Sequence, residues 1–146
     1  MQALGTRLKH KTHIIWDWNG TLLDDVETCV KTMSSLLTRY NLPRITVRQY
    51  REHFRFPVVE YYKHLGFDFE TVPFVKVADE FMELYRRNVC DASLHIGAEI
   101  LLRDLKALGK IQSILSAAGE ADLKKQLIRL EIEPYFDFVY GIADHY

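Results

Sequence analysis

Asp17 and Ser116 are the two residues whose surroundings in this sequence point most directly to chemistry. Asp17 follows a short apolar run, residues 13–16, and precedes the turn-forming stretch Asn19-Gly20-Thr21. Ligands of open α/β sheets bind beyond the carboxyl ends of the strands, where an aspartate after a buried strand lies. Its carboxylate could attack a phosphorus atom and form an aspartyl-phosphate, while Gly20 lets backbone N–H groups approach an anion closely. The competing interpretation is an aspartate that only caps its own turn, and Asp17 alone does not exclude it.

Ser116 occupies the same kind of position on a second predicted strand. It follows the apolar run Ile111 to Leu115 and comes shortly before Gly119 and an amphipathic stretch. A hydroxyl group beside the free N–H groups at the start of a helix can bind an anion. A single serine in this position is more often an ordinary helix cap. Two polar residues at the ends of two strands favour a shared anion site over two separate caps.

Hydrophobic spacing predicts the elements that must position these residues. Short β-branched and aromatic runs predict buried strands at residues 13–16, 111–115 and 138–140. Apolar residues at helical spacing predict helices at residues 97–108 and 119–130. The order strand, helix, strand, helix, strand predicts a parallel, right-handed α/β sheet.

The middle of the chain has a different pattern. Residues 24–91 show helical spacing and no defensible strand, and Asp24-Asp25 occupy the position of a helix N-cap. Two short helices are expected within this stretch, starting from a Thr46 cap and broken at Pro57. The stretch is therefore predicted to be a helical insert after the first strand.

Length, composition and charge exclude several classes of protein. The chain has 146 residues, of which 48% are hydrophobic and 27% charged, as expected for a globular domain. A formal net charge of -1 provides no overall field for nucleic acid, and no apolar stretch is long enough to span a membrane. The two cysteines, Cys29 and Cys90, cannot form a disulfide framework, and no apolar segment follows the basic N-terminus. We therefore expect a cytoplasmic protein that binds neither nucleic acid nor a membrane.

Two segments resemble motifs of the haloacid dehalogenase (HAD) superfamily. IIWDWNGTLLDD is similar to the first motif, a strand followed by Asp-x-Asp-Gly-Thr-Leu, and SILSAAGEADL is similar to the second, a strand ending in Ser or Thr. The helical insert between them resembles the small cap of the subgroup that includes phosphoglycolate phosphatases. The resemblance implies an α/β fold with a HAD-like, Rossmann-type parallel sheet formed by residues 1–23 and 95–146, incomplete at the C-terminus. Residues 24–94 would then be the helical cap.

The resemblance also implies roles for individual residues. Asp17 would be the nucleophile and a ligand of Mg²⁺, and the backbone carbonyl of Asn19 would be a second metal ligand. The phosphoryl oxygens would be bound by four residues, Gly20, Thr21, Ser116 and Ala117. The implied reaction is Mg²⁺-dependent hydrolysis of a small phosphorylated metabolite through an aspartyl-phosphate.

Two departures from the family pattern favour a second hypothesis. Asn19 stands where the family has an aspartate that carries protons, and an amide cannot exchange a proton at neutral pH. The lysine of the third motif and the acidic pair of the fourth would lie beyond Tyr146. The alternative is therefore a catalytically impaired or truncated chain that acts as a phosphate-binding or protein-interaction module.

The first strand also raises the question of self-association. In the resembled fold this strand is central, and the strands on its far side would lie beyond Tyr146. The edge of residues 13–16 would then be exposed and apolar, with Ile14, Ile15 and Trp16 in a row. Exposed strand edges of this kind pair with other chains, so we expect self-association through this edge.

Overall fold

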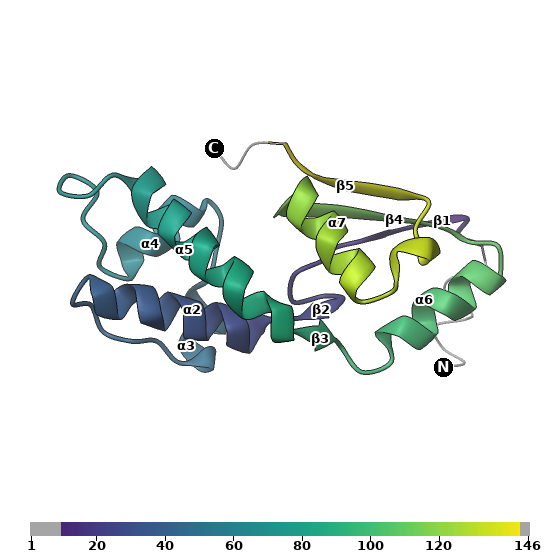
Figure 1. The fold of residues 1–146 in the computed structure, drawn as a ribbon, viewed down its shortest axis with the longest axis horizontal. Helices are drawn as coiled ribbons and strands as arrows, with labels where there is room; N and C mark the ends of the chain where they lie inside the picture. Colours follow the sequence, from purple (N-terminus) through teal and green to yellow (C-terminus); the bar gives the residue numbers. More distant parts are fainter. Residues whose placement is uncertain (1–9, 144–146) are drawn as a thin grey trace. The chain divides into compact units, whose positions relative to one another are not determined.

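The structure, a computed structural model, describes residues 10–143, which form two compact units. One unit holds residues 10–24 and 93–143 and contains a parallel sheet, while the other holds residues 25–92 and is helical (Figure 1). The fold is α/β, as predicted. Within the described residues, no helix is both long enough and apolar enough to cross a membrane.

Three parallel strands form the main sheet, in the spatial order β1-β4-β5. They are β1 (His13–Trp16), β4 (Ile111–Gly119) and β5 (Phe138–Ile142). All three predicted strands are present, and β4 runs four residues further than its apolar run indicated. The pairing of β4 with β5 becomes irregular between Leu115 and Gly119. Such an irregularity bends a strand while letting its pairing resume, which an apolar pattern alone does not signal.

Two helices complete this unit: α6 (Ala98–Ala107), which precedes β4, and α7 (Glu120–Arg129), which joins β4 to β5. A single-turn helix, η2 (Glu133–Tyr135), leads from α7 toward β5. The strand order advances in one direction from β1 to β4 to β5. Because parallel crossovers are right-handed, α6 and α7 are brought to the same face of the sheet.

A buried glutamine ties this covered face together. Gln112 of β4 is fully buried, and its side-chain oxygen accepts a hydrogen bond from Trp16 Nε1 at 3.1 Å. Its side-chain nitrogen donates to the Leu102 carbonyl of α6 at 2.9 Å. A buried amide is costly unless both its donor and its acceptor are paired. Gln112 therefore specifies how β1, β4 and α6 fit together.

A second, two-stranded sheet was not predicted. β2 (Leu23–Asp24) pairs antiparallel with β3 (Ser93–Leu94), at the two points where the chain passes between the units. Strands of two residues are too short to show an alternating pattern. The helical segment consequently begins later than the predicted residue 24, at Val26.

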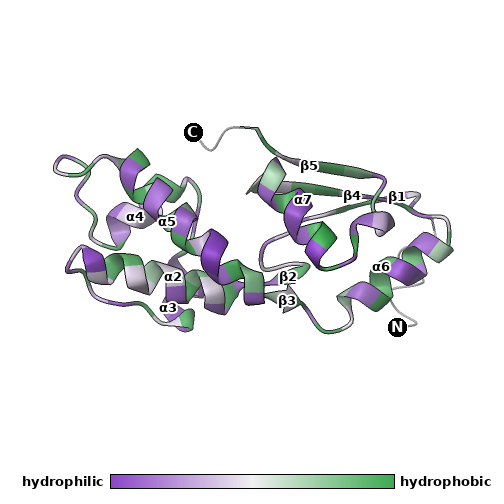
Figure 2. Cartoon of the chain, viewed as in Figure 1, coloured by the Kyte–Doolittle hydropathy of each residue, from purple (hydrophilic) through white to green (hydrophobic). Residues whose placement is uncertain are grey.

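The helical unit has two long helices and two short ones, and the two short ones were predicted. Their bounds are α2 (Val26–Arg39), α3 (Val47–His53), α4 (Val58–His64) and α5 (Phe74–Asn88), followed by a single-turn helix η1 (Val89–Asp91). The long helices carry hydrophobic residues on one side, visible as green bands in Figure 2. Their core is aliphatic and aromatic and contains Met33, Leu36, Leu37, Tyr61, Tyr62, Phe67 and Val77.

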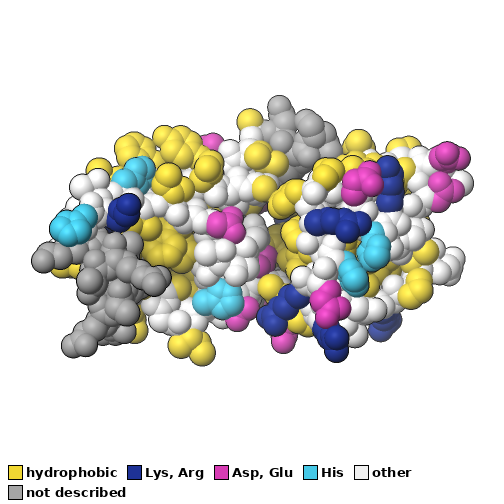
Figure 3. Space-filling view, turned by 180° about the vertical axis from the view of Figure 1, so that it is seen from behind, with side chains coloured by type: hydrophobic (Ala, Val, Ile, Leu, Met, Phe, Trp, Pro, Cys, Tyr) yellow, Lys and Arg dark blue, Asp and Glu magenta, His cyan; other side chains and the backbone are white. Residues whose placement is uncertain are grey.

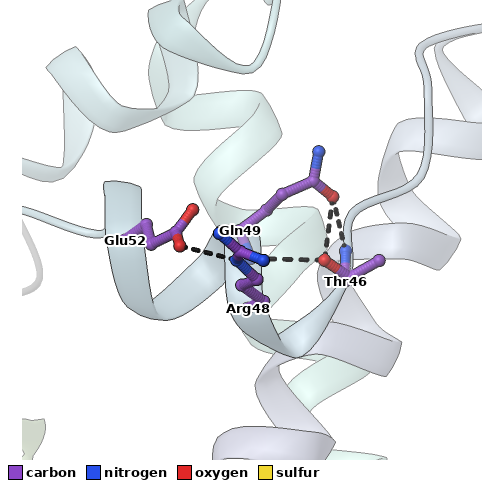
Figure 4. Close-up of polar contacts among 4 residues, drawn as sticks. All are labelled: Thr46, Arg48, Gln49 and Glu52. Carbon is purple, nitrogen blue, oxygen red and sulfur yellow. Dashed lines mark hydrogen bonds and ion pairs between the residues drawn. The ribbon is translucent and has the colours of Figure 1, made fainter.

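The predicted cap at Thr46 begins α3 (Figure 4). Thr46 Oγ1 accepts a hydrogen bond from the Gln49 N–H at 3.2 Å, and Gln49 Oε1 accepts one from the Thr46 N–H at 2.9 Å. These two reciprocal bonds form a capping box. Beside it, Arg48 Nε donates a hydrogen bond to Glu52 Oε1 at 2.8 Å. A helix of seven residues is marginal by itself, so these reciprocal bonds help to define where it starts.

Asp25 stands at the N-cap position of α2 but does not cap the helix. Its buried carboxylate accepts a hydrogen bond from the Tyr85 hydroxyl of α5 at 2.6 Å, and Cys29 Sγ lies 3.6 Å from the same oxygen. Burial, together with the negative charge of Asp25, raises the pKa of the Cys29 thiol to about 12. This cysteine is therefore a protonated, unreactive core residue.

Candidate functional site

Asp17 lies immediately after β1 with its side chain exposed. Thr21 Oγ1 donates a hydrogen bond to Asp17 Oδ2 at 2.9 Å. A neutral hydroxyl donor orients the carboxylate without cancelling its charge. The arrangement therefore keeps the carboxylate usable both as a nucleophile and as a ligand of a hard cation.

The segment after Asp17 closes into a tight turn around one carbonyl group. The Trp18 carbonyl accepts hydrogen bonds from the N–H groups of Thr21, Leu22 and Leu23, at 3.2, 3.0 and 3.0 Å. Gly20 has a φ of 68°, a left-handed conformation that residues with a side chain adopt only at a cost. The turn exposes the polar residues of the predicted motif and buries its apolar ones.

Trp18 anchors this turn to the rest of the α/β unit. Its side chain is fully buried, and Nε1 donates a hydrogen bond to Gln126 Oε1 of α7 at 2.7 Å. Gln126 is itself 8% exposed, so neither group has water as a ready substitute. Trp18 and its partner lie 108 residues apart, and no local pattern could have identified the contact.

Ser116 and Ala117 lie within the last part of β4. Ser116 is 8% exposed, and its Oγ accepts a hydrogen bond from the Ala118 N–H at 3.0 Å. A serine hydroxyl that accepts one bond can still donate its hydrogen to an anion. Ala117 is exposed, and α7 begins three residues further along at Glu120. The N-cap residue of α7 is Gly119, which has no side chain that could accept hydrogen bonds from the first N–H groups of the helix.

The sheet register brings the two motifs together. Trp16 of β1 pairs with Ile114 of β4, so Asp17 and Ser116 follow paired residues by one and two positions. Neighbouring strands are about 4.8 Å apart. Both residues therefore lie at the carboxyl edge of the sheet, on adjacent strands, together with Asn19, Gly20 and Thr21 of the turn.

Gly141 of β5 is a part of this region that the sequence did not reveal. A Cβ atom added to it would lie 2.6 Å from the Ala118 carbonyl oxygen and 2.6 Å from Glu120 Cα. Both are backbone atoms, which cannot rotate away. Gly141 thus lets β5 press against the turn between Ser116 and α7.

The described residues offer few ligands for a metal ion. Among residues 10–143, no three histidine, cysteine, aspartate or glutamate side chains are grouped so that they could hold one. Mg²⁺ is often bound by only one or two carboxylates, with water and substrate phosphate completing its shell. The Asp17 carboxylate fits that pattern of an ion shared with a phosphorylated ligand.

The family and fold of the chain are shown by comparison with known proteins. Residues 14–146 match the sequence model of a family described as haloacid dehalogenase-like hydrolase. No curated protein matches the chain.

Several solved structures share the fold at low sequence identity. A haloacid dehalogenase-like family protein from Streptococcus pneumoniae is 18% identical, with a TM-score of 0.77, over 90% of this chain and 61% of that protein. A predicted phosphoglycolate phosphatase from Haemophilus somnus is 18% identical, with a TM-score of 0.75, over 91% and 64%. Protein Tyrosine Kinase A from Mycobacterium tuberculosis is 20% identical, with a TM-score of 0.79, over 91% and 61%. The chain therefore spans less than two thirds of the length of each of these proteins.

Proposed function

Because the chain belongs to the haloacid dehalogenase-like hydrolase family, we propose that it binds the phosphoryl group of a small phosphorylated metabolite and hydrolyses it through an aspartyl-phosphate. The observation that carries the proposal is the β1–β4 register, which puts Asp17, just after β1, near Ser116 in the last part of β4. A predicted phosphoglycolate phosphatase is among the similar structures, and its name supports a substrate of this class.

In the proposed reaction, an Asp17 carboxylate oxygen attacks phosphorus and the bond from phosphorus to the leaving oxygen breaks. Thr21 holds the carboxylate through its 2.9 Å hydrogen bond. The Ser116 hydroxyl and the backbone N–H of Ala117 receive the phosphoryl oxygens. The sequence also assigned Gly20 to the phosphate, but its N–H donates to the Leu23 carbonyl at 2.9 Å. Water then attacks the aspartyl-phosphate, which restores Asp17 and releases phosphate.

Mg²⁺ is the cation that this site would take. The Asp17 carboxylate and the Asn19 backbone carbonyl would hold it, because both are the hard oxygen ligands that this ion prefers. When bound, Mg²⁺ reduces the repulsion between a carboxylate and an anionic phosphate. We also propose that the helical unit, residues 25–92, serves as a cap that selects the substrate.

Asn19 supports a second candidate function, a module that binds phosphate or a phosphorylated partner with little or no turnover. Its side chain is exposed in the turn, two residues after the nucleophile, but an amide cannot donate a proton to a leaving group or accept one from water. General acid–base help contributes typically 10² to 10⁴-fold to such reactions. The two candidates share the binding site and differ only in the fate of the phosphoryl group.

Binding of a phosphoryl analogue tests the shared part. Beryllofluoride with Mg²⁺ should bind the 146-residue protein, and Asp17→Asn should abolish that binding. Ser116→Ala should weaken it by about 1–3 kcal/mol, for one lost charge-assisted bond. Asp104→Asn, which neutralises an exposed carboxylate on α6, is the matched control and should change nothing. Equal binding by the wild type and Asp17→Asn would remove Asp17 from its assigned role.

Turnover separates the two candidates. The phosphatase requires that an aryl phosphate, which has a good leaving group, be hydrolysed in an Asp17-dependent manner. Asn19→Asp should then raise the rate by 10² to 10⁴-fold, and more for alkyl than for aryl phosphates, because alkyl leaving groups need more acid assistance. Analogue binding without turnover in either variant would instead assign the chain to the binding module.

A further inference from the structure

Two histidine side chains of the helical unit lie against each other, and neither belongs to the site described above. His53 is the last residue of α3 and His64 is the last residue of α4, and their ring centroids lie 4.7 Å apart. We propose that these two imidazoles bind a divalent transition-metal ion such as Zn²⁺, which holds the two short helices together. Such a metal site would be independent of Asp17 and Ser116.

The separation of the two rings is that of two histidines bound to one metal ion. A metal–nitrogen bond is about 2.0–2.1 Å long, and the centre of the imidazole ring lies roughly 1.1 Å beyond the nitrogen. Two rings that bind one ion at angles between about 90° and 110°, as in octahedral and tetrahedral sites, therefore have centres about 4.4–5.2 Å apart. The observed 4.7 Å falls within this range. The ring planes are inclined by 46°, so the rings are not stacked face to face.

The ring nitrogens of both histidines have no polar partner within residues 10–143. Neither ring makes a hydrogen bond or an ion pair there, whereas His13 Nε2 makes a hydrogen bond with Ser113 Oγ at 2.8 Å. A neutral imidazole binds a metal through one nitrogen, and its other N–H then donates to a carboxylate, a carbonyl or water. His53 is half-buried and His64 is exposed, so water can reach the second nitrogen. Both rings are therefore available as metal ligands.

The packing one helical turn earlier holds the pair in place. Tyr50 of α3 and Tyr61 of α4 each lie three residues before one of the histidines, so they project from the same helix faces. Their rings meet edge to face with centroids 6.1 Å apart, and Tyr61 is only 1% exposed. The ring of Phe54, the residue after His53, also contacts Tyr61, at 5.3 Å. The two helix ends are therefore arranged before a metal binds, which reduces the entropic cost of bringing two ligands together.

The surroundings of the pair favour a transition metal over Mg²⁺ or Ca²⁺. Residues 44–64 contain five lysine and arginine side chains and two glutamates, and Figure 3 shows basic side chains beside histidine atoms on the helical unit. Hard cations are bound through carboxylate and carbonyl oxygens, whereas imidazole nitrogen suits Zn²⁺, Ni²⁺ and Cu²⁺. Lys63, the neighbour of His64, is paired with Glu60 at 2.8 Å, which reduces its repulsion of a metal ion. We therefore expect Zn²⁺ to bind this pair and Mg²⁺ not to bind it.

A metal ion bound by this pair would have two protein ligands. Within residues 10–143, no third histidine, cysteine, aspartate or glutamate is grouped with the pair, so water or an anion would complete the coordination shell. The affinity should therefore be lower than that of a structural zinc site with four protein ligands. The α3 helix has seven residues and buries none of them, so a metal bound to both helices should stabilise this part of the helical unit.

Calorimetric titration of the untagged 146-residue protein with Zn²⁺ tests the site. We expect the wild type to bind Zn²⁺, and the dissociation constant to rise at least about tenfold in both His53→Ala and His64→Ala, because losing a ligand should weaken binding no less than losing an outer-shell partner does. His95→Ala is the matched control, since it removes a histidine from the α/β unit, and it should bind Zn²⁺ like the wild type. Asp17→Asn should also leave Zn²⁺ binding unchanged, so a failure of the proposed phosphate site would not affect this result.

A second readout uses Cu²⁺, whose electron paramagnetic resonance spectrum should show two coordinated imidazole nitrogens in the wild type. No Zn²⁺ binding by the wild type at micromolar protein concentrations would overturn the proposal. So would an equal loss of affinity in His95→Ala, or a loss in only one of the two pair variants, because the ion would then be bound elsewhere. If circular dichroism shows that an alanine variant does not fold, His53→Gln or His64→Gln takes its place, since glutamine keeps a polar side chain of similar size.

Discussion

Replacing Gly141 by alanine should damage the proposed phosphate site without changing any residue that we propose to bind phosphate. The added methyl carbon would lie 2.6 Å from the Ala118 oxygen, 2.6 Å from Glu120 Cα and 2.7 Å from Glu120 N. All three are backbone atoms of the turn that joins β4 to α7. Ordinary contacts of this type are longer than 3.4 Å, so either the turn or β5 must move by several tenths of an ångström.

The magnitude follows from two opposing terms. Overpacking of a close contact lowers the free energy of unfolding by about 1–3 kcal/mol. Replacing glycine by alanine also reduces the freedom of the unfolded chain, which raises the free energy of unfolding by about 0.4–1 kcal/mol. The net destabilisation should therefore be about 1–2 kcal/mol. With a urea dependence of about 1–3 kcal/mol per molar, the midpoint of unfolding should fall by roughly 1 M or somewhat less.

Tryptophan fluorescence is a suitable assay for this loss. The chain has two tryptophans, Trp16 and Trp18, and both belong to the α/β unit that contains Gly141. The same samples should show weaker beryllofluoride binding, because the displaced turn carries Ser116 and the start of α7. Gly109→Ala is the control: its φ is 69° and nothing lies within 4 Å, so it should cost stability through backbone strain alone and leave analogue binding intact.

Two outcomes would refute this reasoning. A Gly141→Ala protein with wild-type stability and wild-type binding would show that the turn yields freely and that the close approach has no consequence. Equal loss of binding in Gly109→Ala would show that binding follows overall stability rather than the position of the turn.

Three further predictions concern the buried groups Gln126 and Cys29. Gln126→Leu removes the acceptor of the 2.7 Å bond from Trp18 and leaves a buried N–H unpaired, so it should lower the free energy of unfolding by about 1–3 kcal/mol; an unchanged urea midpoint would contradict this. Cys29 should react with a thiol reagent only on unfolding, whereas exposed Cys90 should react at once, and two fast thiols would show that Cys29 is accessible. The pKa of the Cys29 thiol rises from its ordinary value of 9.0 to about 12 in the folded protein. The contribution of this protonated thiol to the free energy of unfolding should therefore be complete below pH 9 and be lost as the pH rises toward 12. Cys29→Ala should remove this part of the fall in stability at alkaline pH.

The elements that carry the candidate site could be predicted because their signals are local. The run His13–Trp16 is short, β-branched and aromatic, and it forms β1 with the predicted bounds. The Thr46 cap of α3 depends on residues three positions apart, and the structure contains both of its reciprocal bonds. Asp17 could be placed just after a strand by the same reasoning. Ser116 was predicted to end its strand but lies inside β4, which continues to Gly119; the register nevertheless brings the two residues to adjacent strands.

The features that were missed depend on residues distant in sequence or on very short segments. Trp18 and Gln126 are 108 residues apart, and the crowding at Gly141 comes from backbone atoms of another strand and its turn. Pairing of β2 with β3 involves two residues on each side, too few for a period to appear. Asp25 had the sequence of a helix cap, but its carboxylate accepts a hydrogen bond from the Tyr85 hydroxyl, a contact that depends on the packing of α2 against α5. In each of these features, tertiary contacts determine the structure, and local sequence preference does not reveal them.

In the proposed site, the residues that would bind a phosphoryl group differ from the residue that would assist its release. The proposed groups are the Asp17 carboxylate, just after β1, and the Ser116 hydroxyl and Ala117 N–H, in the last part of β4. Water attack on an aspartyl-phosphate is accelerated by a side chain that can accept a proton, and Asn19 cannot provide this help. If Asp17 is phosphorylated in this chain, the covalent state should therefore outlast that of a variant with aspartate at position 19. A long lifetime of the aspartyl-phosphate would favour the phosphate-binding module, and a short one would favour the phosphatase.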